Sequence, residues 1–335
     1  MDLITDFLQT FVGQLQQPTL AFLIGGMVIA ALGSKLEIPD AIYRFVVFML
    51  LMKIGLKAGM EIREADLSAL MLPAFFAVLI GCLIVLIGRN TLARLPRVRF
   101  DDALATAGLF GAVSASTLAA GMLNLDAANI AYEGWVPALY PFMDIPALVL
   151  AIVLANIHQR KKSGADGDEI DIRQIIVDSL RGAALSALVL GLVLGLLTRP
   201  DSVVKGFYEP MFRGFLSILM LIMGIEAYAR IKELRKVAQC YAVYAFVAPV
   251  IHGLIGFSLG TVAHYLTGFS PGGVILLAVI AASSSDISGP PTLRGGIPSA
   301  NPSAFVGSST SIGTPVAIVV CIPLFIALSE IVFQA

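Results

Sequence analysis

Long apolar stretches, separated by short polar segments, follow one another along almost the whole chain. A helix needs about 20 apolar residues to cross a bilayer, so the pattern predicts an all-α polytopic membrane protein with ten transmembrane helices. Only 13% of the residues are charged and the formal net charge is −1, which excludes an ordinary soluble enzyme, a disordered protein and a nucleic-acid-binding protein. The ten predicted spans are 18–33, 39–57, 67–88, 102–122, 137–158, 174–198, 213–229, 237–267, 273–291 and 304–333.

The basic residues are distributed unevenly between the segments that join the spans. Fourteen of the 22 lie in the segments after the odd-numbered spans, and five lie on the opposite side. Because basic segments remain in the cytoplasm, the side with fourteen is predicted to be cytoplasmic. Ten spans then place both termini outside. Lys53 and Lys57, near the outer end of the second span, are expected to snorkel toward the membrane surface.

The chain partly matches itself when it is shifted by 169 residues. Five spans in each half give the halves opposite orientations, as in the inverted repeats of secondary transporters. The sequence therefore predicts a first five-helix repeat at 1–158, a cytoplasmic linker at 159–173 and a second repeat at 174–335. The linker suits either a solvated connection or a docking site for a cytoplasmic regulator. The matching pairs are Gly26 and Gly195, Gly55 and Gly224, Ser114 and Ser283, Ser116 and Ser285, and Pro146 and Pro315.

The fourth and ninth spans hold corresponding positions in the two halves, and neither is a plain apolar helix. The fourth contains GLFGAVSAST at 108–117 and the ninth contains AASSSDISGPPT at 281–292. Pro290 and Pro291 cannot lie inside a continuous helix, and backbone groups freed within a membrane must find partners or line a wet cavity. Small residues also permit close helix packing. Paired interruptions, however, are typical of a transporter binding site, so we expect helices 4 and 9 to be discontinuous.

Three consecutive serines at 283–285 and Asp286 make the ninth span too polar for packing alone. An acidic residue in lipid costs roughly 2.5–3.5 kcal/mol or more, which indicates a functional role. Hydroxyls, carbonyls and one carboxylate suit a hard alkali cation, and the N-termini of broken helices suit a small anion. Asp144 and Thr314 are candidates for the ion path. Asp144, two residues before a proline, fits a helix-capping carboxylate equally well.

Several segments then carry a family resemblance. The chain closely resembles, over essentially its full length, the cyanobacterial sodium-dependent bicarbonate transporter family, SbtA. The resembling segments are PTLAFLIGGMVIAALG at 18–33, LFGAVSAST at 109–117, ALYPFMDIPALV at 138–149, RGFLSILMLIMG at 213–224, ELRKVAQ at 233–239 and AVIAASSSDISGPPTLRGGIPSANPSAFVGSSTSIGTP at 278–315.

The resemblance implies a core domain that moves against a gate domain, and a homotrimer in the plasma (inner) membrane. It implies sodium-coupled bicarbonate uptake for the carbon-concentrating mechanism. It also implies a cytoplasmic PII-like partner, SbtB, that binds adenine nucleotides and inhibits transport; the linker at 159–173 is shorter than in the family, which bears on how much of that contact it supplies. By resemblance, bicarbonate would lie near Gly111, Ala112, Val113, Ser114, Ser116 and Thr117. Sodium would lie near Ser283, Ser284, Ser285 and Asp286.

Other functions remain open on the residues alone. The site would serve a sodium- or proton-coupled carrier of another small anion or organic acid without any change of residue. An intramembrane hydrolase is disfavoured because no histidine or lysine lies near 283–285. A channel is disfavoured because mirrored broken helices are typical of alternating access. The sequence therefore predicts a secondary transporter that is not an enzyme and needs no cofactor, with sodium as the coupling ion.

Overall fold

The computed structural model describes residues 18–36, 38–64, 67–163, 183–234, 239–286 and 289–333, together with 173, 177, 180 and 181. These residues form helices joined by short loops, and no strand occurs among them, which confirms the all-α prediction. The α-helices are α2 (Pro18–Ala31), α3 (Asp40–Glu64), α4 (Leu67–Thr91), α5 (Phe100–Gly111), α6 (Ala115–Ala127), α7 (Tyr140–Ser163), α9 (Ala183–Leu197), α10 (Asp201–Val203), α11 (Glu209–Leu234), α12 (Cys240–Thr267), α13 (Pro271–Ala282), α14 (Gly289–Gly296), α15 (Pro302–Ser308), α16 (Thr314–Val316) and α17 (Ile322–Phe333). Tighter 3₁₀ turns are η1 (Leu92–Arg94) and η2 (Val136–Leu139), and wider π-helical turns are η3 (Val204–Tyr208), η4 (Ser309–Gly313) and η5 (Ala317–Cys321).

Each predicted span coincides with a helix or with helices interrupted by a break. Six helical runs are long and apolar enough to cross a membrane, and three shorter apolar helices, in α2, α9 and α13, accompany them. The chain is therefore a multi-pass helical protein of membrane character. Most of the predicted linker, 164–172, lies outside the described residues, and α7 extends to Ser163.

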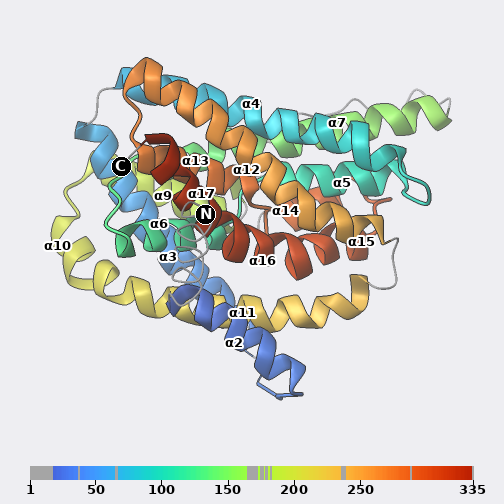
Figure 1. Cartoon of the computed structure of the whole chain (residues 1–335), viewed down its shortest axis with the longest axis horizontal. Helices are drawn as coiled ribbons and strands as arrows, with labels where there is room; N and C mark the ends of the chain where they lie inside the picture. The colour runs from blue at the N-terminus through green and yellow to red at the C-terminus, as the bar shows by residue number, and fades with distance from the viewer. Residues whose placement is uncertain are drawn as a thin grey trace.

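Two helix pairs, α2 with α11 and α3 with α9, approach one another through glycine. A β-carbon at Gly26 would collide with the carbonyl oxygen of Leu221 on α11, and one at Gly191 would lie 2.7 Å from the carbonyl oxygen of Met52 on α3. Only glycine permits this backbone contact between helices. In Figure 1, α2 and α11 lie side by side along one edge of the molecule, with α4 and α7 along the opposite edge.

These two pairs repeat the same contacts. Gly26 lies against Gly224 as Gly191 lies against Gly55. Helices α2 and α9 therefore match at an offset of 165 residues, and α3 and α11 match at 169. The single offset of 169 predicted from the sequence is wrong for the first helix by about one helical turn, because Gly26 corresponds to Gly191 rather than to Gly195.

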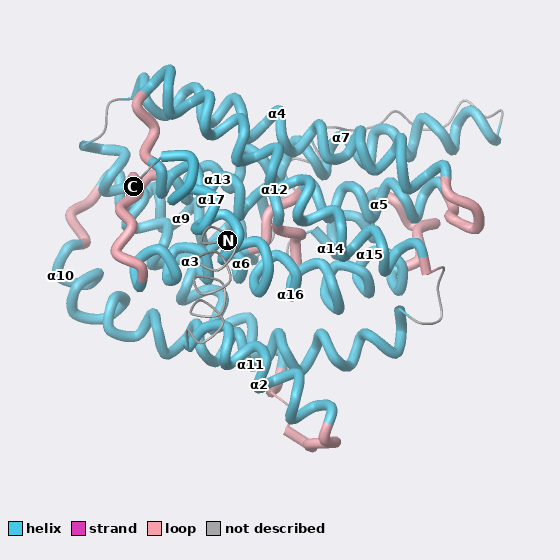
Figure 2. The backbone as a smooth tube through the Cα atoms, in the orientation of Figure 1, coloured by secondary structure: helices cyan, strands magenta, loops and turns pink. Residues whose placement is uncertain are grey.

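Two helices stop in the middle of the molecule, between these edges. α5 ends at Gly111 and α6 begins at Ala115, whereas α13 ends at Ala282 and α14 begins at Gly289. Figure 2 shows loop segments at these breaks inside the helical body rather than at its ends. Residues 112–114 and 283–285 are buried, so the predicted discontinuities lie in the protein interior.

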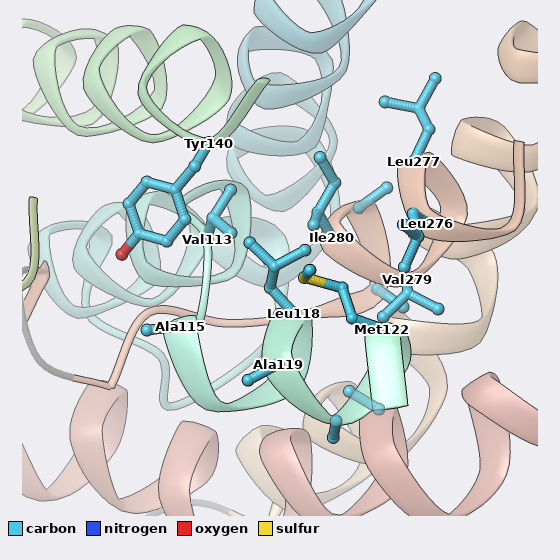
Figure 3. Close-up of a cluster of buried hydrophobic side chains, with 14 of the residues drawn as sticks. Val113, Ala115, Leu118, Ala119, Met122, Tyr140, Leu276, Leu277, Val279 and Ile280 are labelled. Atoms are coloured by element: carbon cyan, nitrogen blue, oxygen red, sulfur yellow. The ribbon is translucent and has the colours of Figure 1, made fainter. Parts of the chain in front are cut away.

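The helix after the first break packs against the helix before the second. Figure 3 shows Leu118 and Met122 of α6 lying beside Val279 and Ile280 of α13. Gly121 brings the two helices close, because a β-carbon there would lie 3.1 Å from Cγ1 of Val279. This apolar contact holds the two broken elements together next to their breaks.

Two carboxylates from the first half fix helix starts in the second half. Glu133 accepts hydrogen bonds from the Ser270 N–H (2.7 Å) and the Ser270 hydroxyl (2.6 Å) at the start of α13. Asp102 Oδ1 accepts from the Asn301 N–H (2.7 Å) at the start of α15. A carboxylate at a helix N-terminus is favoured by the positive end of the helix dipole. The two contacts hold the broken helices as one assembly.

Candidate functional site

The first break is a short extended segment between α5 and α6. The backbone is extended at Ala112 and Ser114, and the Ser114 hydroxyl caps α6 by accepting from the Thr117 N–H at 3.1 Å. Asp144 Oδ1 on α7 accepts from the Val113 N–H at 2.9 Å, and the Asp144 side chain is fully buried. Asp144 thus holds the break in place. It does not cap its own helix, because α7 begins at Tyr140, so the capping interpretation is wrong.

The second break repeats this design. The Ser285 hydroxyl accepts from the Gly289 N–H at 2.9 Å and so closes the start of α14. Pro290 and Pro291 occupy the next two positions of that helix. A proline costs little there, because the first N–H groups of a helix have no partner within it. Ser285 therefore corresponds to Ser114, at an offset of 171 residues.

The two breaks are bound directly to one another. The Ser285 N–H donates to the Leu109 carbonyl oxygen at 2.9 Å. In the equivalent position, the Ser114 N–H donates to Ser283 Oγ (3.0 Å), which in turn donates to the Ile280 carbonyl oxygen (2.7 Å). A serine hydroxyl thus lies between donor and carbonyl on one side of the crossing. This bond pattern fixes the ends of α5 and α13 against each other.

A chain of hydroxyls leads from α6 to Asp286. Ser116 Oγ donates to Asp286 Oδ2 at 2.7 Å and lies 2.8 Å from Ser114 Oγ. Because the Ser116 hydrogen is engaged with the carboxylate, Ser114 must donate to Ser116, and Thr117 Oγ1 donates to Ser114 at 3.1 Å. Three hydroxyl hydrogens therefore point along the chain toward one carboxylate.

The other oxygen of this carboxylate is unoccupied. Asp286 Oδ1 is buried and has no hydrogen-bond partner among the described residues. A buried carboxylate oxygen without a partner loses solvation that nothing repays. Close to it, the first turn of α6 leaves the N–H groups of Ala115 and Ser116 without an acceptor in the described part of the chain. The site thus offers an anionic oxygen and free N–H donors side by side, the chemistry needed for a cation and an anion.

The structure separates the four residues predicted to hold sodium. Ser283 faces Ser114, Ser285 caps α14, and Ser284 Oγ lies 2.7 Å from Ser309 Oγ on η4. Asp286 alone turns toward Ser116. Each serine hydroxyl is thus committed to a different neighbour. Gly111 lies at the end of α5, where a β-carbon would lie 2.9 Å from the carbonyl oxygen of Gly81, so its role is close packing beside the break.

Thr314 lies one turn beyond Ser309, at the end of a π-helical segment. Its side chain is fully buried and Oγ1 has no partner among the described residues. The widened turn at Ser309–Gly313 was not predicted. Its sequence signal is Pro315, which removes a backbone donor and pushes the preceding turn outward; a π-turn accommodates this and often marks a functional region.

Lys53 does not snorkel as predicted. Its side chain is 6% exposed, and Nζ lies 4.0 Å from the centroid of the Phe212 ring on α11. A desolvated cation–π contact contributes about 2 kcal/mol, whereas burial of an ammonium group costs several kcal/mol. The contact with Phe212 therefore offsets only part of the cost of burying this charge.

Comparison with known families places this geometry. The family model of the Na+-dependent bicarbonate transporter superfamily matches residues 18–330. The chain belongs to this superfamily. The match includes both breaks, Asp144 and Asp286, and confirms the resemblance found in the sequence. A comparison with curated proteins gives no match. Membership of this superfamily makes the chain a transporter of the sodium-dependent bicarbonate type, a carrier rather than an enzyme.

Proposed function

We propose that the protein is a sodium–bicarbonate symporter whose two ligands bind at the crossing of the breaks. The observation that carries this proposal is the unpartnered, buried Oδ1 of Asp286 beside the first turn of α6. Sodium is a hard cation that prefers oxygen ligands, and Asp286 balances its charge. Bicarbonate accepts hydrogen bonds from the N–H groups at the start of α6, near Val113, Ala115 and Ser116.

Ser116 provides the physical basis of coupling. Its hydroxyl is bonded to Asp286, and its N–H is one of the free donors at the start of α6. With the cation site empty, the Asp286 carboxylate repels an incoming anion. Sodium at Asp286 cancels that charge, so bicarbonate binding becomes more favourable, and by reciprocity bicarbonate strengthens sodium binding.

We further propose ten membrane spans in two inverted five-helix repeats, 1–158 and 174–335, joined by a cytoplasmic linker at 159–173. The repeated glycine contacts of α2 with α11 and α9 with α3 support this architecture, as do the matching caps at Ser114 and Ser285. The basic residues favour termini on the outer side.

The setting of the protein is also proposed. The resemblance supports a homotrimer in the plasma membrane that supplies inorganic carbon to the carbon-concentrating mechanism. It also supports inhibition by a PII-like protein at the cytoplasmic face, which nucleotide-dependent binding of the purified partner would test.

The test of function is uptake of radiolabelled bicarbonate into proteoliposomes of purified protein. We expect uptake to require an inward sodium gradient and to be absent with choline in place of sodium. Equal uptake without sodium contradicts the proposal, and uptake driven by a proton gradient alone identifies a proton-coupled carrier. Strong competition by nitrate or small organic acids, with bicarbonate ineffective, identifies another substrate.

A further inference from the structure

A second buried charge lies away from the breaks, on α3. Lys53 is 94% buried, and its ammonium group lies over the Phe212 ring. No carboxylate forms an ion pair with it within the described residues. A buried ammonium group ordinarily has an anionic partner, because the charge is otherwise desolvated without compensation.

The next turn of α3 adds a second ammonium group. Lys57 lies four residues from Lys53 on the same face, and the two charges repel each other. Lys57 likewise forms no ion pair in the described chain. Asp126 and Glu209 attract Lys53 electrostatically without forming an ion pair with it. Two neighbouring cations thus lack a direct counter-ion.

The position of these lysines relates them to the broken helices. α3 contacts α6 and α11, and Asp126 lies at the end of α6 opposite to its capping residue Ser114. By the helical rise, these two ends of α6 are roughly 18 Å apart. The lysines are therefore near the far end of the helix whose first turn faces Asp286, and they are separate from the breaks.

We propose that Lys53 and Lys57 form a binding site for a small monovalent anion, distinct from the site at the breaks. Phe212 covers one side of the Lys53 ammonium group, and the anion supplies the missing charge. The attraction that Asp126 and Glu209 exert on Lys53 becomes repulsion for any anion, which disfavours a second negative charge on the ligand. The identity of the anion as bicarbonate rests on the proposed function; the site then holds the substrate at one end of its route along α6.

The first test measures bicarbonate uptake kinetics of Lys53→Met, Lys53→Arg and Lys205→Gln at saturating sodium. Met preserves the apolar stem, Arg restores the charge, and Lys205 is an exposed lysine on η3. We expect K53M to raise KM for bicarbonate about tenfold, as for the loss of one charge-assisted hydrogen bond, with unchanged half-saturation for sodium. K53R and K205Q should resemble the wild type. A KM for K53M within twofold of the wild type overturns the proposal.

The second test does not depend on transport. We expect potassium bicarbonate or potassium nitrate, in sodium-free buffer, to raise the unfolding temperature of the purified wild type and of Asp286→Asn, but not that of K53M. The absence of a rise in the wild type, or an equal rise in K53M, overturns the anion site. If K53M does not fold, Lys57→Gln replaces it with the same expected loss. Failure of the sodium-gradient experiment with this rise intact contradicts only the symport function.

Discussion

Ser116 donates its hydroxyl hydrogen to Oδ2 of Asp286 over 2.7 Å, although the two residues are 170 positions apart. Each belongs to a segment where a helix is interrupted, and each segment comes from a different half of the chain. One residue thus heads α6 and also contacts the carboxylate of the opposite break. Any change at either residue should affect both ligands of the proposed symporter.

Asp286→Asn tests the charge at the site. Asparagine retains an oxygen that can accept from Ser116 but carries no negative charge, so sodium loses its counter-ion. We expect D286N to abolish sodium-dependent bicarbonate uptake in proteoliposomes while the unfolding temperature stays near that of the wild type. Asp201→Asn, at the start of α10, is the matched control and should transport normally. An active D286N would contradict the cation role of Asp286.

Ser116→Ala should weaken both sodium affinity and stability. The change leaves Asp286 Oδ2 buried without its donor, which costs about 1–3 kcal/mol, and it removes the end of the hydroxyl chain. We expect a higher half-saturation for sodium and a lower unfolding temperature, with recovery in Ser116→Thr. Ser258→Ala removes an exposed hydroxyl that bonds only to its own helix and should change neither quantity. Wild-type sodium affinity in S116A would refute this account.

Asp144 is predicted to act through its hydrogen bond and not through its charge. Asp144→Asn can still accept from the buried Val113 N–H, so we expect uptake near the wild-type rate. Asp144→Ala leaves that N–H without a partner, at a cost of about 1–3 kcal/mol, and should slow uptake by disturbing the first break. Comparison of initial uptake rates decides the matter: an inactive D144N would instead place Asp144 on the ion path.

Neighbouring glycines on α2 should respond oppositely to alanine. A β-carbon at Gly26 would meet the backbone of Leu221, whereas none of the described atoms lies within 4 Å of one at Gly25. We expect Gly26→Ala to destabilise the protein by about 1–3 kcal/mol through overpacking. Gly25→Ala should be neutral or stabilise the helix by up to about 1 kcal/mol. Unfolding temperatures in detergent measure both, and equal effects would argue against close contact of α2 with α11.

The location of the breaks could be predicted from the chain alone. The stretches 108–117 and 281–292 contain the residues at which helices end, because glycine, serine and paired prolines act on the local backbone. The grouping of Ser283, Ser284 and Ser285 with Asp286 was wrong. The backbone is extended at Ser283, and successive side chains of an extended segment point in opposite directions. Adjacent serines therefore reach different neighbours.

The direction of Lys53 could not be predicted either. Amphipathic side chains near a helix end ordinarily reach toward water, and the sequence does not reveal that Phe212 of α11 covers this one. The repeat shows the same limitation. Sequence matching used one offset of 169, whereas the contacts give 165, 169 and 171 along the chain, because the helices and breaks of the two halves differ slightly in length.

The sequence by itself determined the helical class, the long apolar segments and the two places where a helix must stop, because these depend on hydrophobicity and on local backbone preference. Only the tertiary structure decided which hydroxyl meets which oxygen, and which carboxylate oxygen is left without a partner. Those contacts join segments about 170 residues apart. Their geometry depends on how two broken helices cross, and no local preference specifies that crossing.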